Sequence, residues 1–495
     1  MDTSVSTRGV DLRSRHAYDA DGRNVRGINM NKAGIPFLSA AELADLIRKR
    51  EVSPVDAVDA YLERIEALDD KLYAYLTVCR DEARQAARES ERALARGGHR
   101  GPMHGVPFAV KDQLYTRGIR TTGGSPIFND FVPDEDATVI TNLKSAGAIL
   151  LGKLNMTEFA TTGLAHAFNT ARNPWDLERY TGGSSSGSGA ATAAFLCATS
   201  LGEDTGGSVR FPATWCGVVG LRPTWGRVSR YGVMPGVWSM DTIGPLSRTV
   251  EDCAITLQAV AGRDPKDPYT SDLPVPDYRQ ALNGDIRGTR VGIVTELLSS
   301  SLVAPEIRDA VTLAANVLGE LGASVEEVSI PLTSHAAAIS SGLRVEAPTN
   351  YRDLVLNRLQ EIGHDNRIGY LTGSLIPATV YYKAQKLRSL LRQQVLEALE
   401  NVDVLVTPTA GVAAQKIEPD PVVDSKEKAN RIPWLLTTAF SLASIPALSI
   451  CCGFTSQDLP VGLQIGGKPF DEATGLRVAH AYEQNTTWHT RKPPI

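Results

Sequence analysis

The sequence predicts an α/β fold in which helices cover both faces of a central β-sheet. Short apolar segments alternate with longer amphipathic segments over most of the chain. That alternation is typical of sheets whose strands are connected by helices. The 495 residues, 42% of them hydrophobic and 22% charged, are sufficient to form a large core. We expect one domain over residues 37–495, preceded by an N-terminal extension over residues 1–36.

Three helices are predicted before the first strand, because each begins or ends at a recognisable cap. Ser39 to Glu42 form a capping box, and the helix runs to Arg50. Ser53 followed by Pro54 begins a second helix that ends near Leu68. Residues 81–95 form a charged third helix, which ends at a pair of glycines.

The central and C-terminal parts of the chain carry the sheet. Its predicted strands are short apolar segments at residues 106–110, 148–151, 291–294, 324–330, 402–406, 447–451 and 461–465. The predicted helices between them lie at residues 137–145, 305–321 and 379–399. Residues 435–452 form a longer apolar segment, but polar residues interrupt it, so we expect a buried helix, turn and strand there rather than a membrane span.

Composition excludes several classes of function. The net charge is −5 and basic residues are interspersed with 56 acidic ones, so no basic surface for nucleic acid or membrane is indicated. The N-terminus lacks the apolar segment of a secretory signal. The six cysteines and eight histidines show no metal-binding spacing. We expect a cytoplasmic enzyme with buried free thiols and with neither metal nor cofactor.

Two blocks rich in glycine and serine indicate catalysis. They are Gly182–Ser188 and Asp204–Arg210. A serine nucleophile needs a base for its proton and N–H donors for the oxyanion. Glycines before Ser208 allow successive N–H groups to converge on one point, which predicts an oxyanion hole beside that hydroxyl.

Lys111 is the candidate base, because it follows a buried strand. Burial disfavours the ammonium form of a lysine and can bring its pKa towards neutrality. A hydroxyl from the first Gly/Ser block could carry the proton from the nucleophile to this amine. The sequence therefore predicts a serine hydrolase that uses no histidine.

The same segments resemble the amidase signature family from about Phe37 to nearly the C-terminus. The matching motifs are G-G-S-S-x-G-S from Gly182 and D-T-G-G-S-V-R from Asp204. This resemblance implies a central mixed sheet, a Ser–cis-Ser–Lys triad and homodimers as a common state. The roles that it implies are Ser208 as nucleophile, Ser184 as proton bridge after a cis bond from Gly183, Lys111 as base, and the N–H groups of Thr205, Gly206, Gly207 and Ser208 as oxyanion hole.

Other interpretations of the Gly/Ser blocks are weaker. Gly183–Gly187 matches the G-x-S-x-G nucleophile elbow of α/β-hydrolases, but no downstream histidine has a distinctive context and the second block stays unexplained. A phosphate cradle lacks the G-x-x-x-x-G-K-[ST] motif. Purely structural turns would not account for a correctly placed lysine, and the complete triad argues against an inactive scaffold.

Substrate choice depends on positions outside the triad. Within the family, the resemblance extends to the A subunit of glutamyl-tRNA amidotransferase, in which an acidic residue holds the glutamine amino group. Alignment by eye places Trp434 there, and residues 157–164 also depart from the pattern of that protein. We therefore predict a stand-alone amidase for apolar or aryl amides, with carbamates, ureas and esters as further substrates. Its expected substrate-binding residues are Gly183, Ser185, Trp434, Thr161 and Thr162, with variable insertions around residues 265–390. The alternative is the glutaminase component of an amidotransferase complex.

Overall fold

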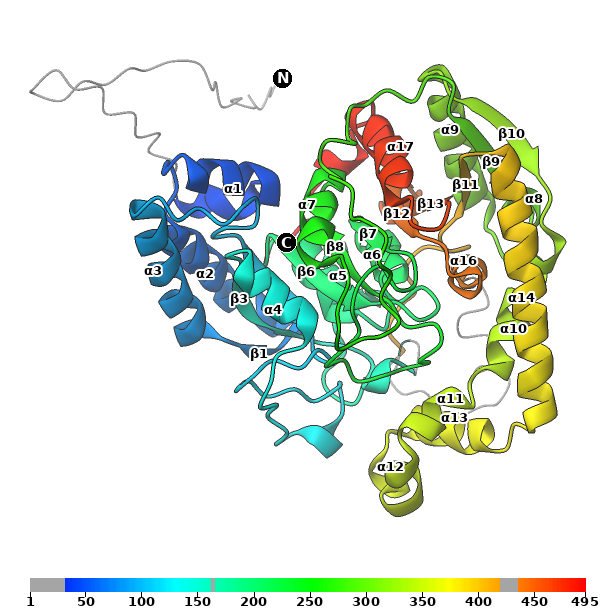
Figure 1. The fold of residues 1–495 in the computed structure, drawn as a ribbon, viewed down its shortest axis with the longest axis horizontal. Helices are drawn as coiled ribbons and strands as arrows, with labels where there is room; N and C mark the ends of the chain where they lie inside the picture. The colour runs from blue at the N-terminus through cyan, green and yellow to red at the C-terminus, as the bar shows by residue number, and fades with distance from the viewer. Residues whose placement is uncertain (1–31, 162–163, 165, 419–434) are drawn as a thin grey trace, which may run out of the picture.

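The computed structural model describes residues 32–161, 164, 166–418 and 435–495. A single mixed sheet of eleven strands runs through this part of the chain (Figure 1). In spatial order its strands are β1 (Tyr75–Val78), β3 (Ile149–Leu154), β2 (Pro107–Lys111), β6 (Thr199–Glu203), β8 (Ile243–Ser247), β7 (Val219–Arg222), β12 (Ala447–Phe454), β13 (Pro460–Gly467), β11 (Val404–Pro408), β9 (Arg290–Val294) and β10 (Ser324–Val328). A small second sheet pairs β4 (Arg172–Asn173) with β5 (Asp176–Tyr180).

Strand direction divides the sheet into three regions. Strands β3, β2 and β6 are parallel near one end, and β11, β9 and β10 are parallel at the other. The strands between them pair antiparallel. Every residue of β2, β6, β8, β12 except its last, and β13 is buried, as expected when helices cover both faces of a sheet. The predicted α/β class and mixed sheet are confirmed.

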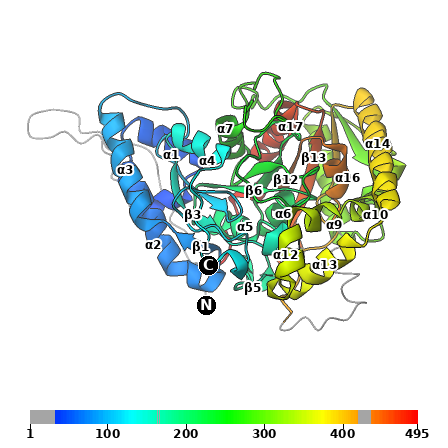
Figure 2. The same cartoon turned by 60° about the horizontal axis from the view of Figure 1, so that its bottom comes forward.

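Helices flank the sheet and close its two ends. Helices α1 to α3 lie at one end and α14 at the other (Figures 1 and 2). Their bounds are α1 (Ala40–Arg48), α2 (Pro54–Leu72), α3 (Arg80–Ala95), α4 (Thr138–Ser145), α5 (Ser186–Ala193), α6 (Arg210–Cys216), α7 (Val250–Val260), α8 (Thr295–Leu298), α9 (Pro305–Glu320), α10 (Ala336–Gly342), α11 (Glu346–Asn350), α12 (Arg352–Asn357), α13 (His364–Ser374), α14 (Ala378–Asn401), α16 (Thr438–Ala443) and α17 (Glu472–Gln484). Within the described residues, none of these helices is both long and apolar enough to cross a membrane.

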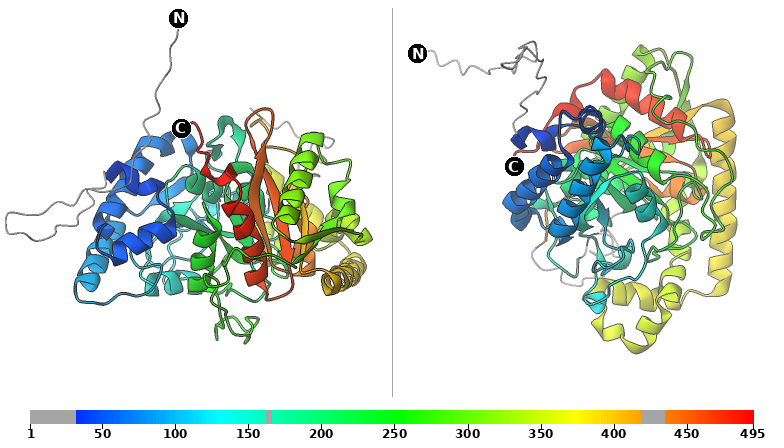
Figure 3. Two further views of the ribbon diagram at one scale, coloured as in Figure 1. Left: turned by 90° about the horizontal axis from the view of Figure 1, so that it is seen from above. Right: turned by 60° about the vertical axis from the view of Figure 1, so that its left-hand side comes forward.

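The C-terminal segment returns to the N-terminal helices (Figure 3). Lys492 Nζ lies 4.3 Å from the centroid of the Phe37 ring. Most of the extension predicted over residues 1–36 lies outside the described residues. Its last part, η1 (Lys32–Phe37), is a 3₁₀ helix that α2 holds, because Tyr61 Oη donates to the Pro36 carbonyl at 3.3 Å.

Predicted elements with clear caps or apolar periodicity agree with the structure to within a few residues. The capping box at Ser39 is present, and the helix, turn and strand predicted over residues 435–452 are α16 and β12. Six strands were not predicted, namely β1, β4, β5, β6, β7 and β8. Strand β6 reads Thr-Ser-Leu-Gly-Glu, which has neither an apolar run nor an alternating pattern, yet it is fully buried. Its partners in the sheet, rather than its own propensity, make it a strand.

The centre of the sheet has no room for a side chain at Gly244 on β8. An added Cβ would lie 1.9 Å from the Leu221 carbonyl oxygen. We expect Gly244→Ala to lower the free energy of unfolding by at least about 1–3 kcal/mol in urea denaturation. The control is Gly369→Ala in α13, where a Cβ meets nothing within 4 Å and helix propensity should improve stability by up to about 1 kcal/mol. Equal losses in both variants would contradict this packing argument.

Candidate active site

The candidate site lies where the parallel strands β2 and β6 end. Lys111 is the last residue of β2 and Glu203 is the last residue of β6. Parallel neighbours end at the same edge of a sheet, so the two side chains meet there. Lys111 Nζ lies 3.1 Å from Glu203 Oε2 and 3.3 Å from the Glu203 carbonyl oxygen. Both side chains are fully buried.

The first Gly/Ser block brings Ser184 to the lysine. Lys111 Nζ and Ser184 Oγ are 2.7 Å apart. The Gly183–Ser184 peptide bond is cis, as the family resemblance implies. Gly182 has φ +81°, and a Cβ there would approach Pro212 to 3.0 Å, so this position requires glycine. The structure thus places two of the three predicted triad side chains in contact.

Ser208 lies in the loop between β6 and α6. Its carbonyl accepts a hydrogen bond from the Ser185 N–H at 3.2 Å, which joins the two Gly/Ser blocks. Ser208 is half-buried, whereas Ser184 is 1% exposed. Of the two serines in the predicted triad, Ser208 is therefore the one that a substrate can reach more readily.

The Ser208 loop also exposes backbone donors. The N–H groups of Thr205, Gly206, Gly207 and Ser208 have no hydrogen-bond partner among the described residues. Thr437 Oγ1 donates to the Gly206 carbonyl at 2.6 Å. Because a trans peptide points its C=O and N–H in opposite directions, this bond turns the Gly207 N–H away from Thr437.

Gly207 is required by the same contact. It has φ +138°, and a Cβ there would lie 2.0 Å from Thr437 Oγ1. Any other residue at position 207 would therefore both strain the backbone and displace Thr437.

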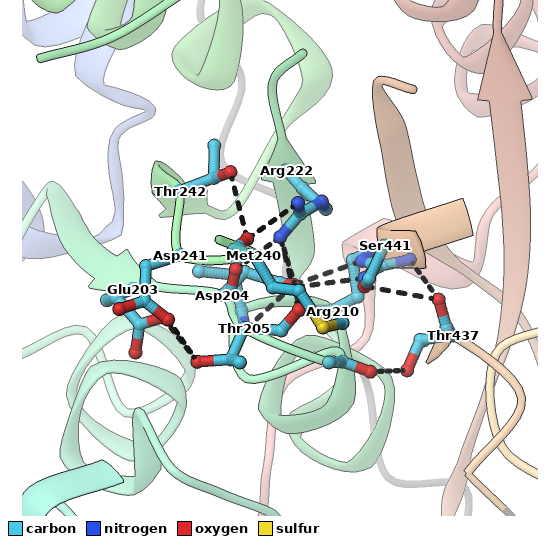
Figure 4. Close-up of polar contacts among 12 residues, drawn as sticks. Glu203, Asp204, Thr205, Arg210, Arg222, Met240, Asp241, Thr242, Thr437 and Ser441 are labelled. Carbon is cyan, nitrogen blue, oxygen red and sulfur yellow. Dashed lines mark hydrogen bonds and ion pairs between the residues drawn. The ribbon is translucent and has the colours of Figure 1, made fainter. Parts of the chain in front are cut away.

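A buried ion network fixes both ends of this loop (Figure 4). Asp204 precedes the loop and Arg210 follows it. Arg210 donates to the Asp204 carboxylate through Nη2 at 2.9 Å and Nε at 3.0 Å, while Arg222 Nη1 lies 3.2 Å from the same carboxylate. The two guanidinium groups hold the pKa of Asp204 well below its usual range despite its burial. The carboxylate therefore stays charged and the loop stays clamped.

Arg210 also ties the loop to the C-terminal part of the sheet. Its Nη1 donates to Gln464 Oε1 at 2.6 Å and to the Thr437 carbonyl at 3.0 Å. Ser441 Oγ accepts from Nη2 at 2.7 Å. One side chain thus joins the loop to β13 and α16.

Burial dominates the electrostatics of the lysine. Desolvation lowers the pKa of Lys111, with the Glu203 carboxylate opposing that shift. Burial raises the pKa of Glu203 to about 7, and the nearby lysine opposes that rise. A lowered lysine pKa is the condition for a neutral amine that accepts a proton.

A second buried lysine supports the loop after β2. Lys153 Nζ lies 3.3 Å from Asp112 Oδ1, and both side chains are fully buried. Asp112 Oδ2 accepts from the Thr122 N–H at 2.8 Å. Asp112 therefore holds the chain that follows Lys111, and its position next to the lysine in sequence is the signal for that role.

The residues predicted to bind substrate lie in different surroundings. Thr161 Oγ1 contacts Asn366 Oδ1 of α13 at 2.7 Å. Ser185 Oγ lies between the backbone carbonyl and N–H of Glu203, at 3.2 and 3.3 Å. Gly183 is buried beside the triad. Thr162 and Trp434 lie outside the described residues.

Three neighbours of the site were not among the predicted residues. Glu203, Thr437 and Asp241 all lie beside the triad or its loop, but nothing in the local sequence distinguishes Thr437 or Asp241. Glu203 had a signal, because it immediately precedes the Asp204 motif. The described residues contain no group of three His, Cys, Asp or Glu side chains able to hold a metal, and all six cysteines are buried free thiols.

Comparison with known proteins shows the family of this chain. The family model described as Amidase matches residues 56–476. The chain belongs to the amidase signature family. The A subunit of glutamyl-tRNA(Gln) amidotransferase from Moorella thermoacetica is 43% identical over 488 residues, covering 93% of this chain and 99% of that protein. The protein of the same name from Geobacter metallireducens is 42% identical over 92% of this chain and 99% of that protein.

The solved structures similar to this chain include an amidotransferase A subunit. The crystal structure of the A subunit of glutamyl-tRNA(Gln) amidotransferase from Thermotoga maritima superimposes with a TM-score of 0.77. It is 33% identical, and the match covers 93% of this chain and 96% of that one. The chain is thus an enzyme of the amidase type, with a fold shared by its family.

These relatives overturn the prediction of a stand-alone amidase for apolar or aryl amides. Eight relatives that are 40–43% identical over nearly the full chain are all named as the A subunit of the amidotransferase. The prediction depended on Trp434 and on residues 157–164, two short segments aligned by eye. Similarity over more than nine-tenths of the chain outweighs two local departures, and it favours the alternative.

We expect the ion network around Asp204 to dominate the stability of the site. Arg210→Met should lower the free energy of unfolding by about 3–5 kcal/mol, because it leaves a buried carboxylate with one of its two cations. The control is Arg290→Met, which breaks the partly exposed pair with Asp403 and should cost far less. Chemical denaturation at neutral pH measures both. Similar losses would contradict a special role for the buried network.

Proposed function

We propose that this chain is the amide-hydrolysing A subunit of a glutamyl-tRNA(Gln) amidotransferase complex, in which it releases ammonia from glutamine. The observation that carries the proposal is the 43% identity with the Moorella thermoacetica protein over 93% of this chain and 99% of that protein. The contact between Lys111 and Ser184 supports amide cleavage as the chemistry. Partner subunits would use the ammonia.

Acylation begins when Ser208 Oγ attacks the carboxamide carbon of glutamine. The Ser208 proton passes to Ser184 Oγ, and the Ser184 proton passes to Lys111 Nζ over the 2.7 Å contact. Burial favours the neutral amine that this transfer needs. Lys111 then returns the proton through Ser184 to the leaving nitrogen, and the C–N bond breaks to give ammonia and acyl-Ser208.

The tetrahedral intermediate carries a negative oxygen that needs donors. The free N–H groups of residues 205–208 supply them in a loop held rigid at both ends. Water then attacks the acyl carbon and gives a proton through Ser184 to Lys111. The bond to Ser208 Oγ breaks, glutamate leaves, and the proton returns through Ser184 to Ser208 Oγ. Each step uses only groups at the end of β2 and the two Gly/Ser blocks.

Ammonia release tests the proposal. We expect the chain, purified together with the subunits that a tagged copy retains from its native host, to release ammonia from L-glutamine in a glutamate-dehydrogenase assay. The chain alone is assayed in parallel, with 4-nitroacetanilide as the aryl amide. Absence of ammonia from both preparations, with release of nitroaniline, would overturn the proposal.

Substitutions in the triad separate the roles. Ser208→Ala should reduce glutamine hydrolysis by at least about 10³-fold, because no acyl-enzyme can form. Lys111→Ala should reduce kcat by about 10²–10⁴-fold, the usual contribution of a general base. The controls are Ser389→Ala and Lys383→Ala, both exposed on α14. Losses below tenfold in the triad variants would remove those residues from the mechanism.

A further inference from the structure

Glu203 lies beside the triad, yet the proposed proton relay does not use it. Its side chain is fully buried at the end of β6. It reaches Lys111 twice, through Oε2 at 3.1 Å and through its backbone carbonyl at 3.3 Å. Its other carboxyl oxygen, Oε1, lies 2.8 Å from Thr205 Oγ1 (Figure 4). Burying a carboxyl group costs free energy, so these contacts suggest that Glu203 has a role at the site.

The contacts of the Lys111 amine specify its orientation. A neutral amine has two N–H donors and one lone pair. Glu203 offers two acceptors, its carbonyl and its carboxylate, while Ser184 Oγ is the third neighbour at 2.7 Å. When both N–H groups donate to Glu203, the lone pair faces Ser184. Glu203 thereby turns the amine towards the hydroxyl whose proton it accepts.

A second carboxyl shares the Thr205 hydroxyl. Thr205 Oγ1 also lies 2.8 Å from Asp241 Oδ1. One hydroxyl carries one proton, so it donates to only one of the two carboxyl groups. The second contact is a hydrogen bond only when the other carboxyl is protonated. With both contacts made as hydrogen bonds, the Glu203–Thr205–Asp241 group holds one acidic proton and one negative charge. Burial raises the pKa of both acids, which favours that state.

The other charged groups near this site have partners of their own, so Lys111 is the group that responds to this negative charge. Asp204 is engaged with Arg210 and Arg222. The positive charge of Arg230 favours the ionised form of Asp241, and Asp241 also accepts the N–H groups of Gly236 and Val237 at 2.8 and 2.9 Å. Tyr351, between α11 and α12, is a buried phenol near both acids. Lys111 is thus the basic side chain that Glu203 itself contacts.

We propose that Glu203 is the positioning residue of Lys111: it orients the amine towards Ser184, and the one negative charge that it shares with Asp241 strengthens the amine as a base. Burial alone would weaken the amine, because it disfavours the ammonium that forms when Ser208 attacks. As that ammonium forms, the charge moves through Thr205 onto Glu203, next to it. The inference rests on the proposed role of Lys111 as the base for Ser208.

The test follows the pH dependence of Ser208 labelling by a fluorophosphonate, which needs neither glutamine nor partner subunits. Glu203→Gln keeps the shape but leaves the charge on Asp241, farther from the amine. Loss of an opposite charge at this distance should move the midpoint of the acid limb down by about 1–3 pH units. The labelling rate on the alkaline plateau should fall about tenfold, since a weaker base removes the proton more slowly.

Asp241→Asn should have the opposite effect on the midpoint. It confines the negative charge to Glu203, next to Lys111, so the midpoint should rise. Glu203→Asp retains a carboxylate and should keep the midpoint within about half a unit of the wild type. Glu472→Gln removes another buried carboxylate, paired with Arg227, and serves as the control with an unchanged midpoint. A merely structural role for Glu203 would not move the two midpoints in opposite directions.

The outcomes separate this inference from the proposed function. A wild-type midpoint in Glu203→Gln, or a lowered midpoint in Asp241→Asn, would overturn the role of Glu203 and leave the triad intact. The Asp241→Asn result decides the matter even where Glu203→Gln does not fold. Failure of the wild type to label at Ser208, with Ser208→Ala as the blank, would overturn the nucleophile assignment and this inference with it.

Discussion

The site depends on one buried ion pair, that of Asp204 with Arg210. These residues flank the loop that carries Ser208, and their bidentate contact closes the loop at its base. Arg222 holds the same carboxylate from β7. Buried charges are stable only when partners and hydrogen bonds replace the lost water, and this network supplies both. Without it, the glycine-rich loop would lose the geometry that directs its N–H groups.

The Asp204–Arg210 pair also explains why distant parts of the chain form one site. Arg210 contacts Thr437, whose hydroxyl in turn fixes the Gly206 carbonyl. The loop that carries Ser208 is therefore oriented by residues more than two hundred positions away in sequence. Such a site is preorganised, because its donors are held in place before substrate arrives.

The electrostatics around Lys111 differ from those around Asp204. The guanidinium groups of Arg210 and Arg222 keep the Asp204 carboxylate ionised. Around Lys111, burial disfavours the charged form of the amine, so its charge depends on its neighbours. The amine, the Glu203 carboxyl and the Asp241 carboxyl lie in contact or share one hydroxyl. Groups coupled in this way titrate together, so protonation of Lys111 changes the pKa values of both carboxyl groups.

Local sequence was enough to predict the α/β class, the helices that begin at Ser39 and Ser53, and Lys111 as a buried base, because caps and apolar runs encode them. The contact between Lys111 and Ser184 was implied by the resemblance of two spaced motifs to a known family. The remaining features arise from tertiary packing. Strand β6 has no pattern of its own, and only pairing with β2 and β8 makes it a strand that ends beside Lys111. Thr437 and Asp241 join the site through long-range packing, for which no local propensity exists. Substrate choice likewise could not be read from Trp434, since one side chain does not define a pocket.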